Sequence, residues 1–423
     1  MNTTSRLIGL LDCNNFFVSC ERLFRPDLAN KPVMVLSSND GCVVARSQEV
    51  KDLRIPMGVP HFQIRDMCDK HSIVSFSSNF TLYRDISARV MSVLRNFTET
   101  CEVYSIDEAF FTINIDNDHE ILEKLQNLRQ TIMHHTGIPV SVGLADTKTL
   151  AKVASKVAKS QATGVTFLPY ERWLKMSKKW ACTEVWGLGG GINGQLRALG
   201  IETASEFMSL SEVAVRSRWG VYGSRVRQEL LGKQVYGVKL PTADVRASLT
   251  SSRSLAVPTG RLSDVERFVF YHVSVCARKL RQEKLQARGV RLSFLVKAYG
   301  QKRRSIGREA VMIEATDSTN VLLRVVGRLL RELWREGLWC RKVEVSVFDI
   351  SPLSTRSLSL FEDKVKTENT TTLEKLMDAM EDKFGSQVLT YARLINTEAG
   401  ARSGQKSPAY TTRWSDIPTV KTG

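Results

Sequence analysis

Residues 104–111 read Tyr-Ser-Ile-Asp-Glu-Ala-Phe-Phe and place two adjacent carboxylates, Asp107 and Glu108, among residues that favour β-strands. Side chains alternate across a strand, so both carboxylates can reach one ion only at a strand end, a bulge or a tight turn. Unpaired buried carboxylates are costly, and a metal cation is a natural compensation. A solvated hairpin tip is the alternative interpretation, and it explains this stretch alone equally well.

A third carboxylate favours the metal site. Asp12 closes the apolar run RLIGLLD at residues 6–12, which predicts a buried strand followed by a polar turn. Taken alone, such an Asp more often caps a helix. Further strands are predicted at 101–106, 109–115 and 138–145, with helices over 83–97 and 119–137. This β-α-β-β-α-β order is ferredoxin-like and allows the acidic residues to lie on neighbouring central strands.

The composition describes an ordinary folded chain. Its 423 residues suffice for two to four domains, with 43% hydrophobic and 25% charged residues. No stretch approaches 18 apolar residues and no secretory signal begins the chain, so no membrane association is expected. The eight cysteines are scattered without CxxC pairs, which is typical of buried thiols in a reducing cytoplasm. We therefore expect a cytoplasmic protein.

The positive charge is concentrated in one block. The net charge is +16, yet residues 1–172 carry 19 Lys and Arg against 19 Asp and Glu. Residues 246–350 carry 21 Lys and Arg against 10 Asp and Glu, an excess of 11. This asymmetry favours a polyanionic partner over a merely basic domain. The block repeats the β-α-β-β-α-β pattern, with Lys302, Arg303 and Arg304 at the tip of its central hairpin.

Two further segments suit phosphates. The run VWGLGGGI at 185–192 precedes a helix, and a glycine turn there exposes backbone N–H groups, although no GK[ST] follows to make a P-loop. Residues 147–159 predict a helix with Lys148, Lys152, Lys156 and Lys159 on one face. That face is either a solvated stripe or directs its last lysine at phosphates. Residues 44–53 predict a helix with Arg46 and Lys51, facing either a triphosphate or solvent.

Three carboxylates in one small sheet suit Mg²⁺, which prefers hard oxygen ligands. Two such ions form the clamp used for in-line attack on phosphorus. Together with the basic block, this predicts a nucleotide and a nucleic-acid duplex as substrates.

These features resemble the Y-family, or translesion, DNA polymerases, most closely the UmuC branch, the catalytic subunit of the bacterial SOS mutagenic polymerase. The resemblance is carried by DCNNFFVSCERLFRP, DGCVVARSQEVK, YSIDEAF, LAKVASKVAK, VWGLGGGI and YTTRWSD. It spans essentially the full length, and the combination of motifs is highly specific although each motif alone is weak or moderate.

The resemblance implies a multidomain α+β fold, a right-hand polymerase with a ferredoxin-like palm, small fingers, a helical helix-hairpin-helix thumb and a β-α-β-β-α-β little finger. The implied boundaries are 1–19 and 80–172 for the palm, 20–79 for the fingers, 173–236 for the thumb, 237–245 for a linker, 246–350 for the DNA-binding little finger and 351–423 for a C-terminal interaction tail.

The resemblance also implies roles for single residues. Asp12, Asp107 and Glu108 are the expected catalytic carboxylates, and with the carbonyl of Cys13 they are the expected ligands of two Mg²⁺ ions. Asp107 is expected to span both ions, and Glu108 to serve mainly the ion that activates the primer 3′-OH. Phe17, next to Phe16, is the expected steric gate that leaves no room for a 2′-OH; ordinary core packing is the alternative for Phe17.

The remaining implied contacts involve the dNTP and the DNA. The triphosphate is expected to meet Lys51, Lys159 and Arg46. The primer-template DNA is expected to meet Gly187, Gly189, Gly191, Lys302, Arg303 and Arg304.

The chain departs from the family pattern twice. Asn14 stands where some members have a second Asp, as is usual in the UmuC branch. Ser357 replaces the Gln of clamp-binding peptides, while Leu358, Leu360 and Phe361 remain, so contact with a sliding clamp is expected through a degenerate motif. The branch further implies a UmuD′-like dimer and a RecA filament as partners, and a nucleoid-associated location.

We therefore expect an error-prone, template-directed DNA polymerase that performs translesion synthesis in SOS mutagenesis and DNA damage tolerance. A catalytically silent DNA-binding regulator of the same fold is the alternative, although a pure binder gains nothing from clustered carboxylates beside DNA. A nucleotide cyclase with a similar palm is a second alternative, which the basic block disfavours.

Overall fold

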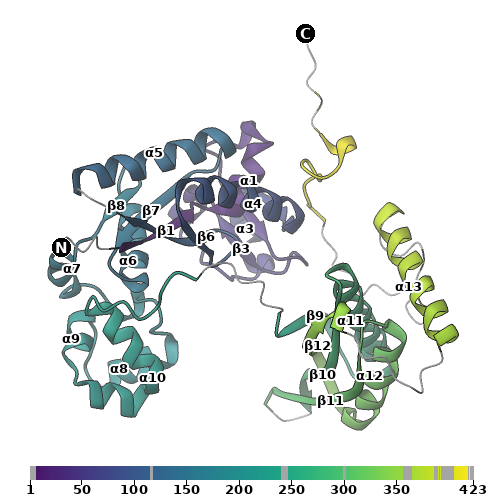
Figure 1. Cartoon of the computed structure of the whole chain (residues 1–423). Coiled ribbons are helices and arrows are strands. Elements are labelled where there is room, and N and C mark those ends of the chain that lie inside the picture. Colours follow the sequence, from purple (N-terminus) through teal and green to yellow (C-terminus); the bar gives the residue numbers. More distant parts are fainter. Residues whose placement is uncertain are drawn as a thin grey trace. The chain divides into compact units, whose positions relative to one another are not determined.

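The structure is a computed structural model of the chain. It describes residues 6–114, 118–239, 246–298, 302–355, 364–384 and 404–417, together with residues 389, 391 and 419. The chain divides into two compact units (Figure 1). The first unit comprises Met1–Thr242 and Arg402–Gly423, and the second comprises Ala243–Ala401.

The first unit is built on a five-stranded sheet in the order β5-β6-β1-β7-β8. Its strands are β1 (Arg6–Cys13), β5 (Thr100–Val103), β6 (Glu108–Asn114), β7 (Val140–Ala145) and β8 (Val165–Phe167). β1 lies in the centre and pairs antiparallel with both β6 and β7. The ferredoxin-like arrangement expected from the sequence is confirmed, and the two acidic stretches lie on neighbouring strands.

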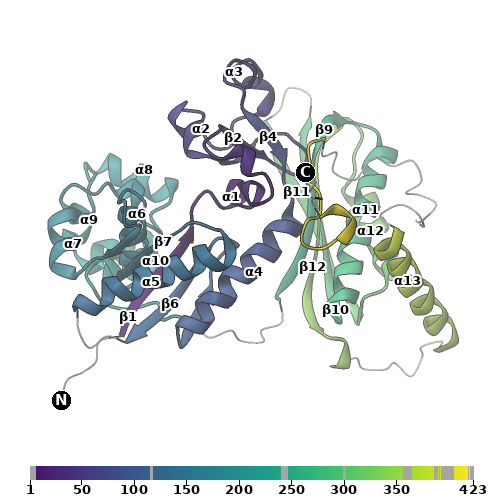
Figure 2. The ribbon, with the colours of Figure 1, turned by 90° about the horizontal axis from the view of Figure 1, so that it is seen from above.

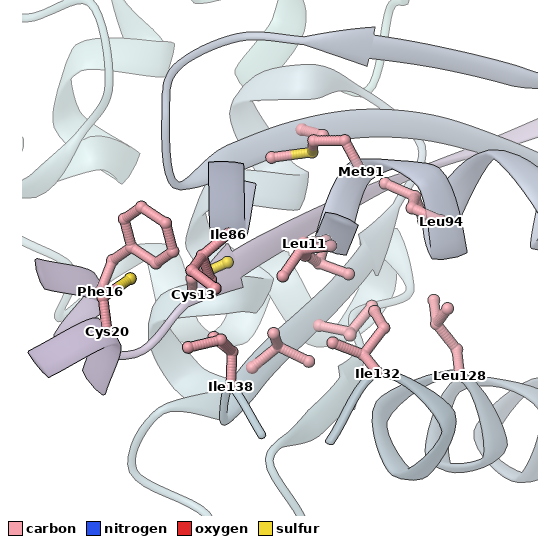
Figure 3. Packing of buried hydrophobic residues seen from close by; sticks show 14 of the residues in the cluster. Leu11, Cys13, Phe16, Cys20, Ile86, Met91, Leu94, Leu128, Ile132 and Ile138 are labelled. Carbon is pink, nitrogen blue, oxygen red and sulfur yellow. The ribbon is translucent and has the colours of Figure 1, made fainter. Parts of the chain in front are cut away.

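Alternation along β1 directs its side chains into two layers. The surrounding helices are α1 (Phe16–Leu23), α4 (Phe80–Phe97), α5 (Asp118–Thr136) and α6 (Lys148–Ala158). Leu11 and Cys13 pack in a cluster with residues of α1, α4 and α5 (Figure 3). Leu10 instead packs with Ala151 of α6. Asp12 follows Leu10 in this alternation, so it lies on the α6 side of the sheet.

Residues 20–79 contain a small sheet in the order β3-β2-β4. Its elements are β2 (Val33–Leu36), β3 (Val43–Arg46), α2 (Gln48–Asp52), α3 (Arg65–Lys70) and β4 (Val74–Ser77), with 3-10 turns η1 (Pro26–Leu28) and η2 (His61–Gln63). The prediction of one helix over 44–53 was wrong, because Val43–Arg46 pairs with β2 as a strand. The helix begins only after Ser47, whose side chain accepts the N–H of Val50.

A helical block follows β8. Its elements are α7 (Tyr170–Ser177), η3 (Cys182–Glu184), α8 (Gly190–Ala198), α9 (Ala204–Ser209) and α10 (Glu212–Leu230). They enclose a cluster that includes the fully buried Trp173 and Phe207. The indole N–H of Trp173 donates to the carbonyl of Leu230 at 2.9 Å, which ties the first helix of the block to the last.

The second unit repeats the order of elements with another order of strands. Its elements are β9 (Ser248–Thr259), α11 (Leu262–Gln282), β10 (Leu285–Ala298), β11 (Arg304–Thr316), α12 (Thr319–Leu333) and β12 (Leu338–Pro352), followed by η4 (Leu353–Thr355). The sheet runs β11-β10-β12-β9, and every neighbouring pair is antiparallel. Both helices cover the same face (Figure 2).

The structure divides the 351–423 tail between the two units. Helix α13 (Lys364–Phe384) lies in the second unit, where Asp378 accepts from the Arg281 guanidinium of α11 at 2.6 Å. Glu374 on the same helix is buried and also pairs with Arg281. Residues 404–417, which end in the 3-10 turn η6 (Trp414–Asp416), belong to the first unit. We call residues 404–417 the C-terminal strap.

Candidate active site

The paired ends of β1 and β6 bring two carboxylates together. Asp12 is the Cα partner of Glu108 on one side and of Ser141 on the other. Only 7% of Asp12 is exposed. Because partners in register project to the same face of a sheet, both carboxylates lie on the side covered by α6.

A turn stabilised by Ser105 carries Asp107. The Ser105 hydroxyl donates to the Asp107 carboxylate at 2.6 Å and accepts the N–H of Glu108 at 3.0 Å. The Asp107 carbonyl accepts the N–H of Cys13 at 2.8 Å. Asp107 therefore lies beside the end of β1, just before the ladder begins at Glu108. The stretch is the tight turn of the β5–β6 hairpin: Asp107 is half-buried in the turn, and β6 begins at Glu108.

Helix α6 and its C-cap residue Lys159 supply a counter-ion to each of the two paired carboxylates. Lys159 donates to Asp12 at 2.6 Å, and Lys152 donates to Glu108 at 2.8 Å. The helix lies close to β7, because a Cβ on Gly143 would fall 2.0 Å from the backbone nitrogen of Ser155. Glycine at this position thus sets the distance at which the lysines meet the acids.

The other two lysines of this helix are paired as well. Lys148 donates to Glu102 at 2.6 Å, and Lys156 donates to Glu184. The four lysines are neither a free solvated stripe nor a row of free phosphate ligands. Each one holds an acidic side chain from another element of the first unit.

Lys152 also lies against aromatic rings that the sequence did not single out. Its ammonium is 4.5 Å from the ring centre of Tyr104 and 5.7 Å from that of Trp186. The Trp186 indole N–H donates to the Tyr104 hydroxyl at 3.3 Å. Such cation–π contacts hold the ammonium in place. The only sequence signal for these contacts was that both aromatic residues lie within quoted motifs.

Burial controls the protonation of Asp12. The pKa of Asp12 is raised to about 6: burial raises it most, the nearby Glu108 carboxylate adds to the rise, and Lys159 acts in the opposite direction. The pKa of the Cys13 thiol is raised by burial and by the adjacent Asp12. The negative charge at this strand end is therefore only partly compensated by the protein itself.

The donor set fits a hard divalent cation. Within the residues that the structure describes, no three Asp, Glu, His or Cys side chains converge tightly enough to form a closed metal cluster. The oxygens of Asp12 and Glu108 are instead engaged by flexible lysines. Asp12, a buried carboxyl beside a second carboxylate, is a group whose charged form a dication would stabilise.

Three cations gather at the N-terminal end of α1. Lys51 donates to the side chain of Asn15 at 2.5 Å, and Arg46 donates to the carbonyl of Ile55. The pKa of Lys51 is lowered, first by burial and then by the positive charges of Lys159 and Arg46. The negative charges of Asp12 and Asp52 offset this repulsion only in part. Asn14 points elsewhere, since its side chain accepts from Ser141 at 2.9 Å.

The two phenylalanines of α1 have different environments. Phe16 is buried in the core beside Cys13 and Ile86 (Figure 3). Phe17 is only partly buried, and its ring stacks on that of Tyr83 with centres 4.4 Å apart. Its edge meets Phe80 at 5.7 Å. Phe17 on α1 thus presents an aromatic ring that Tyr83 and Phe80 support.

The predicted DNA contacts lie on exposed backbone and loops. Gly189 caps the N-terminus of α8, and nothing lies within 4 Å of a Cβ built at Gly189 or Gly191. Gly187 has a φ of +97° and lies against Val226. In the second unit Lys302 and the neighbouring Arg303 and Arg304 are exposed where β11 begins.

The open face of the second sheet was missed by the sequence analysis. It presents exposed polar side chains, which along β10 alternate with buried apolar ones, a period-2 signal readable in the sequence, and along β9 alternate with less exposed residues. These residues are Thr250, Ser252, Ser254, Arg291 and Lys297. The residues expected to bind a sliding clamp, Leu358, Leu360 and Phe361, lie outside the described residues. Among the helices that are described, none is long and apolar enough to cross a membrane.

Comparison with known proteins gives the class of this fold. A solved Y-family DNA polymerase chimera, Dbh-Dpo4-Dbh, matches with a TM-score of 0.70 at 20% identity, over 82% of this chain and 99% of that chain. The multidomain α+β architecture is therefore that of a Y-family polymerase.

The sequence comparisons are more specific. Residues 11–156 match the impB/mucB/samB family, residues 246–360 match the C-terminal domain of that family, and residues 371–420 match a domain of unknown function (DUF4113). UmuC of Salmonella typhimurium is 32% identical over 98% of this chain and 100% of its own length. ImpB of the same species is 34% identical over 99% and 100%. DNA polymerase IV of Moorella thermoacetica is 27% identical over 94% and 98%.

The chain belongs to the impB/mucB/samB family, the UmuC branch of the Y-family polymerases, and is a DNA-directed DNA polymerase of translesion synthesis in SOS mutagenesis. Membership implies DNA binding and, in general, dependence on divalent metal ions.

Proposed function

We propose that the polymerase activity resides at the β1–β6 strand end and depends on two Mg²⁺ ions held by Asp12, Asp107, Glu108 and the carbonyl of Cys13. The observation that carries this proposal is the cross-strand pairing of Asp12 with Glu108, each held by a lysine of α6. When bound, Mg²⁺ would lower the pKa of the primer hydroxyl and neutralise charge on the leaving pyrophosphate. We assign Asp107 to both ions and Glu108 mainly to the ion on the primer side.

The lysines that pair with these acids are available to the substrate once a cation takes their place. Lys159 lies beside Asp12 and raises the positive potential felt by Lys51. We assign Lys159, Lys51 and Arg46 to the triphosphate of the incoming dNTP, where fixed positive charge stabilises the leaving group. The half-exposed ring of Phe17 is assigned to the sugar, and Phe16 to the core that supports it.

The DNA is assigned to both units. Backbone N–H groups around Gly187, Gly189 and Gly191 at the start of α8 suit the phosphates of one strand. In the second unit, Lys302, Arg303, Arg304 and the hydroxyls and cations of the open sheet face suit the DNA backbone, because phosphate contacts need donors without base specificity. The palm, fingers, thumb, linker, little finger and tail are assigned to the ranges expected from the sequence.

Partner proteins complete the proposal. We propose that a UmuD′-like dimer and a RecA filament act with the chain, that the 357–361 motif meets a sliding clamp, and that the protein works at the nucleoid. These assignments are supported by membership of the UmuC branch.

Primer extension on a damaged template with Mg²⁺ tests the catalytic assignment. Asp107→Ala and Glu108→Ala should each reduce extension by on the order of 100-fold or more. Glu184→Gln is the matched control, because it removes the acidic partner of another α6 lysine, Lys156. Equal extension by wild type and both alanine variants would contradict the assignment. Strong DNA binding without extension by any of the proteins, with and without partners, would support the silent regulator.

A further inference from the structure

The C-terminal strap, which lies within the domain of unknown function, is bound to the polymerase core of the first unit. Its start extends the small sheet beyond β4: Ser77 donates its N–H to the carbonyl of Gln405 at 3.0 Å, and Gln405 donates its N–H to the Ser77 hydroxyl at 3.0 Å. Further along, Tyr410 stacks on Phe24 at the end of α1 with ring centres 4.4 Å apart. The strap is therefore anchored on both sides of Ser407.

Ser407 enters a buried polar network between α1 and α4. Its hydroxyl donates to the carboxylate of Glu21 at 3.1 Å and accepts from the Asn79 amide at 2.9 Å. Asn79 also donates to the carbonyls of Ser407 and Pro408, at 3.1 Å each. The side chain of Asn79 caps α4 by accepting the N–H of Leu82. One strap residue is thus hydrogen-bonded to the start of α4 and to the middle of α1.

The Glu21 oxygen that accepts from Ser407 also accepts from Tyr83, the residue on which the proposed gate Phe17 stacks. The Tyr83 hydroxyl donates to it at 2.6 Å, and Tyr83 is the ring on which Phe17 stacks. Glu21 and Tyr83 are both fully buried. The second oxygen of Glu21 is buried without a hydrogen-bond partner in the described structure. With so few donors on a buried carboxylate, losing the one from Ser407 leaves it short of hydrogen bonds.

We propose that the C-terminal strap is a specificity element of the polymerase, in which Ser407 is a positioning residue that acts through Glu21 and Tyr83 to hold the Phe17 ring against the sugar of the incoming nucleotide. This inference rests on the proposed role of Phe17 as the steric gate. The C-terminal strap, which is part of the domain of unknown function, would therefore help to exclude ribonucleotides. All the contacts involved lie within the first unit.

The relay predicts a change in selectivity rather than a loss of activity. If the Tyr83 ring is held less firmly, the Phe17 ring that stacks on it can shift, and a 2′-OH is admitted more readily. The catalytic carboxylates stay in place. Ser407→Ala in the full-length chain should therefore increase the ratio of kcat/KM for a ribonucleotide to that for the matching deoxynucleotide by about two- to tenfold, the factor that corresponds to one hydrogen bond. A merely destabilised protein loses active molecules equally for both substrates, so its ratio does not move.

Single-nucleotide incorporation with matched dNTP and rNTP tests the inference. Tyr83→Phe keeps the stacked ring but removes the hydroxyl, so it should raise the ratio in the same way, and it serves if Ser407→Ala folds poorly. Ser407→Thr, which keeps a hydroxyl, should restore the wild-type ratio. Trp414→Ala is the control within the strap, because Trp414 is 91% exposed.

Phe17→Ala separates the inference from the proposed function. A raised ratio in Phe17→Ala, Ser407→Ala and Tyr83→Phe, with Ser407→Thr and Trp414→Ala at the wild-type value, supports the strap as a specificity element. A raised ratio in Phe17→Ala alone overturns the inference and leaves the gate intact. An unchanged ratio in Phe17→Ala overturns both the gate and the relay that depends on it.

Discussion

The two sheets of this polymerase have the same sequence of elements and different strand orders. In the first unit β1 occupies the centre, between β6 and β7. In the second unit the corresponding first strand, β9, lies at an edge. The end of the central strand β1 pairs with the start of β6, where Asp12 is the partner of Glu108. The edge strand β9 has β12 as its one neighbour in the sheet.

The faces of the two sheets differ as well. The first sheet is covered on both faces, by α4 and α5 on one side and by α6 on the other. The second sheet has α11 and α12 on one face and exposed polar residues on the other. Covered faces hold charges in place for chemistry, whereas an open face offers hydroxyls and cations to a long ligand. The comparison teaches that strand order, not element order, distinguishes the sheet to which we assign catalysis from the sheet to which we assign DNA binding.

The largest expected effect is the difference in kcat between an acid-to-amide substitution in the first sheet and the same kind of substitution in the second. Asp12→Asn should lower kcat by on the order of 1000-fold, because it removes charge from the covered strand end. Glu344→Gln on β12 changes an acid that pairs with Lys342 at 2.7 Å, and should leave kcat within about twofold. Primer-extension kinetics measure both. Similar reductions of kcat in both variants would contradict the assignment of catalysis to the first sheet alone.

Core truncation should separate the two units energetically. Leu11→Ala and Leu292→Ala each remove a fully buried side chain from one sheet. Each should lower the free energy of unfolding of its own unit by about 2–5 kcal/mol. Hydrogen exchange followed by mass spectrometry should show lost protection in that unit alone. Matching losses in both units after either change would indicate a single cooperative block.

The pH dependence should differ between catalysis and binding. Because burial raises the pKa of Asp12 to about 6 from an ordinary 3.8, the carboxyl gains a proton as the pH falls through 6 and loses its affinity for metal. Primer extension should fall about tenfold per pH unit below 6, and added Mg²⁺ should move this fall to lower pH. DNA binding by Lys and Arg side chains should change little over the same range, as measured by fluorescence anisotropy.

The stability of the metal-free protein should also depend on the protonation of Asp12, but it should fall as the pH rises, whereas activity should fall as the pH drops. A carboxyl with a raised folded-state pKa binds its proton more tightly when folded, so its stabilising contribution is complete below about pH 4 and is lost as the pH rises through 6. Mg²⁺ should therefore raise the melting temperature more at pH 8 than at pH 5. An equal rise at both pH values, measured by differential scanning fluorimetry, would argue against Asp12 as a ligand.

The smallest effect is expected at the tip of the second sheet. Replacing Lys302, Arg303 and Arg304 together by Ala should reduce the slope of log affinity against log salt by at most about 2.7, at about 0.9 per phosphate contact. Arg291→Ala is the comparison on the open face, and it should change the slope less because Arg291 already pairs with Glu309. An unchanged slope in the triple variant would remove this tip from the DNA interface.

Local signals in the sequence predicted much of the catalytic sheet. The apolar run before Asp12 and the strand after Asp107 lie where the pattern predicted them, because burial and alternation are local properties of the chain, whereas the strand predicted at 101–106 ends at Val103. Helix α6 was predicted from its spacing of lysines. Its four acidic partners were not, since they come from Asp12, Glu102, Glu108 and Glu184, which are distant in sequence.

The sequence by itself determined that this chain has two β-α-β-β-α-β regions, three carboxylates at strand ends and one strongly basic block. Only the tertiary structure decided which strand lies in the centre of each sheet, which lysine neutralises which acid, and where residues 404–417 bind. The physical reason is that periodicity and propensity act over a few residues. Strand order, counter-ion choice and the hydrogen bond from Ser407 to Glu21 depend on packing between segments as many as 386 residues apart.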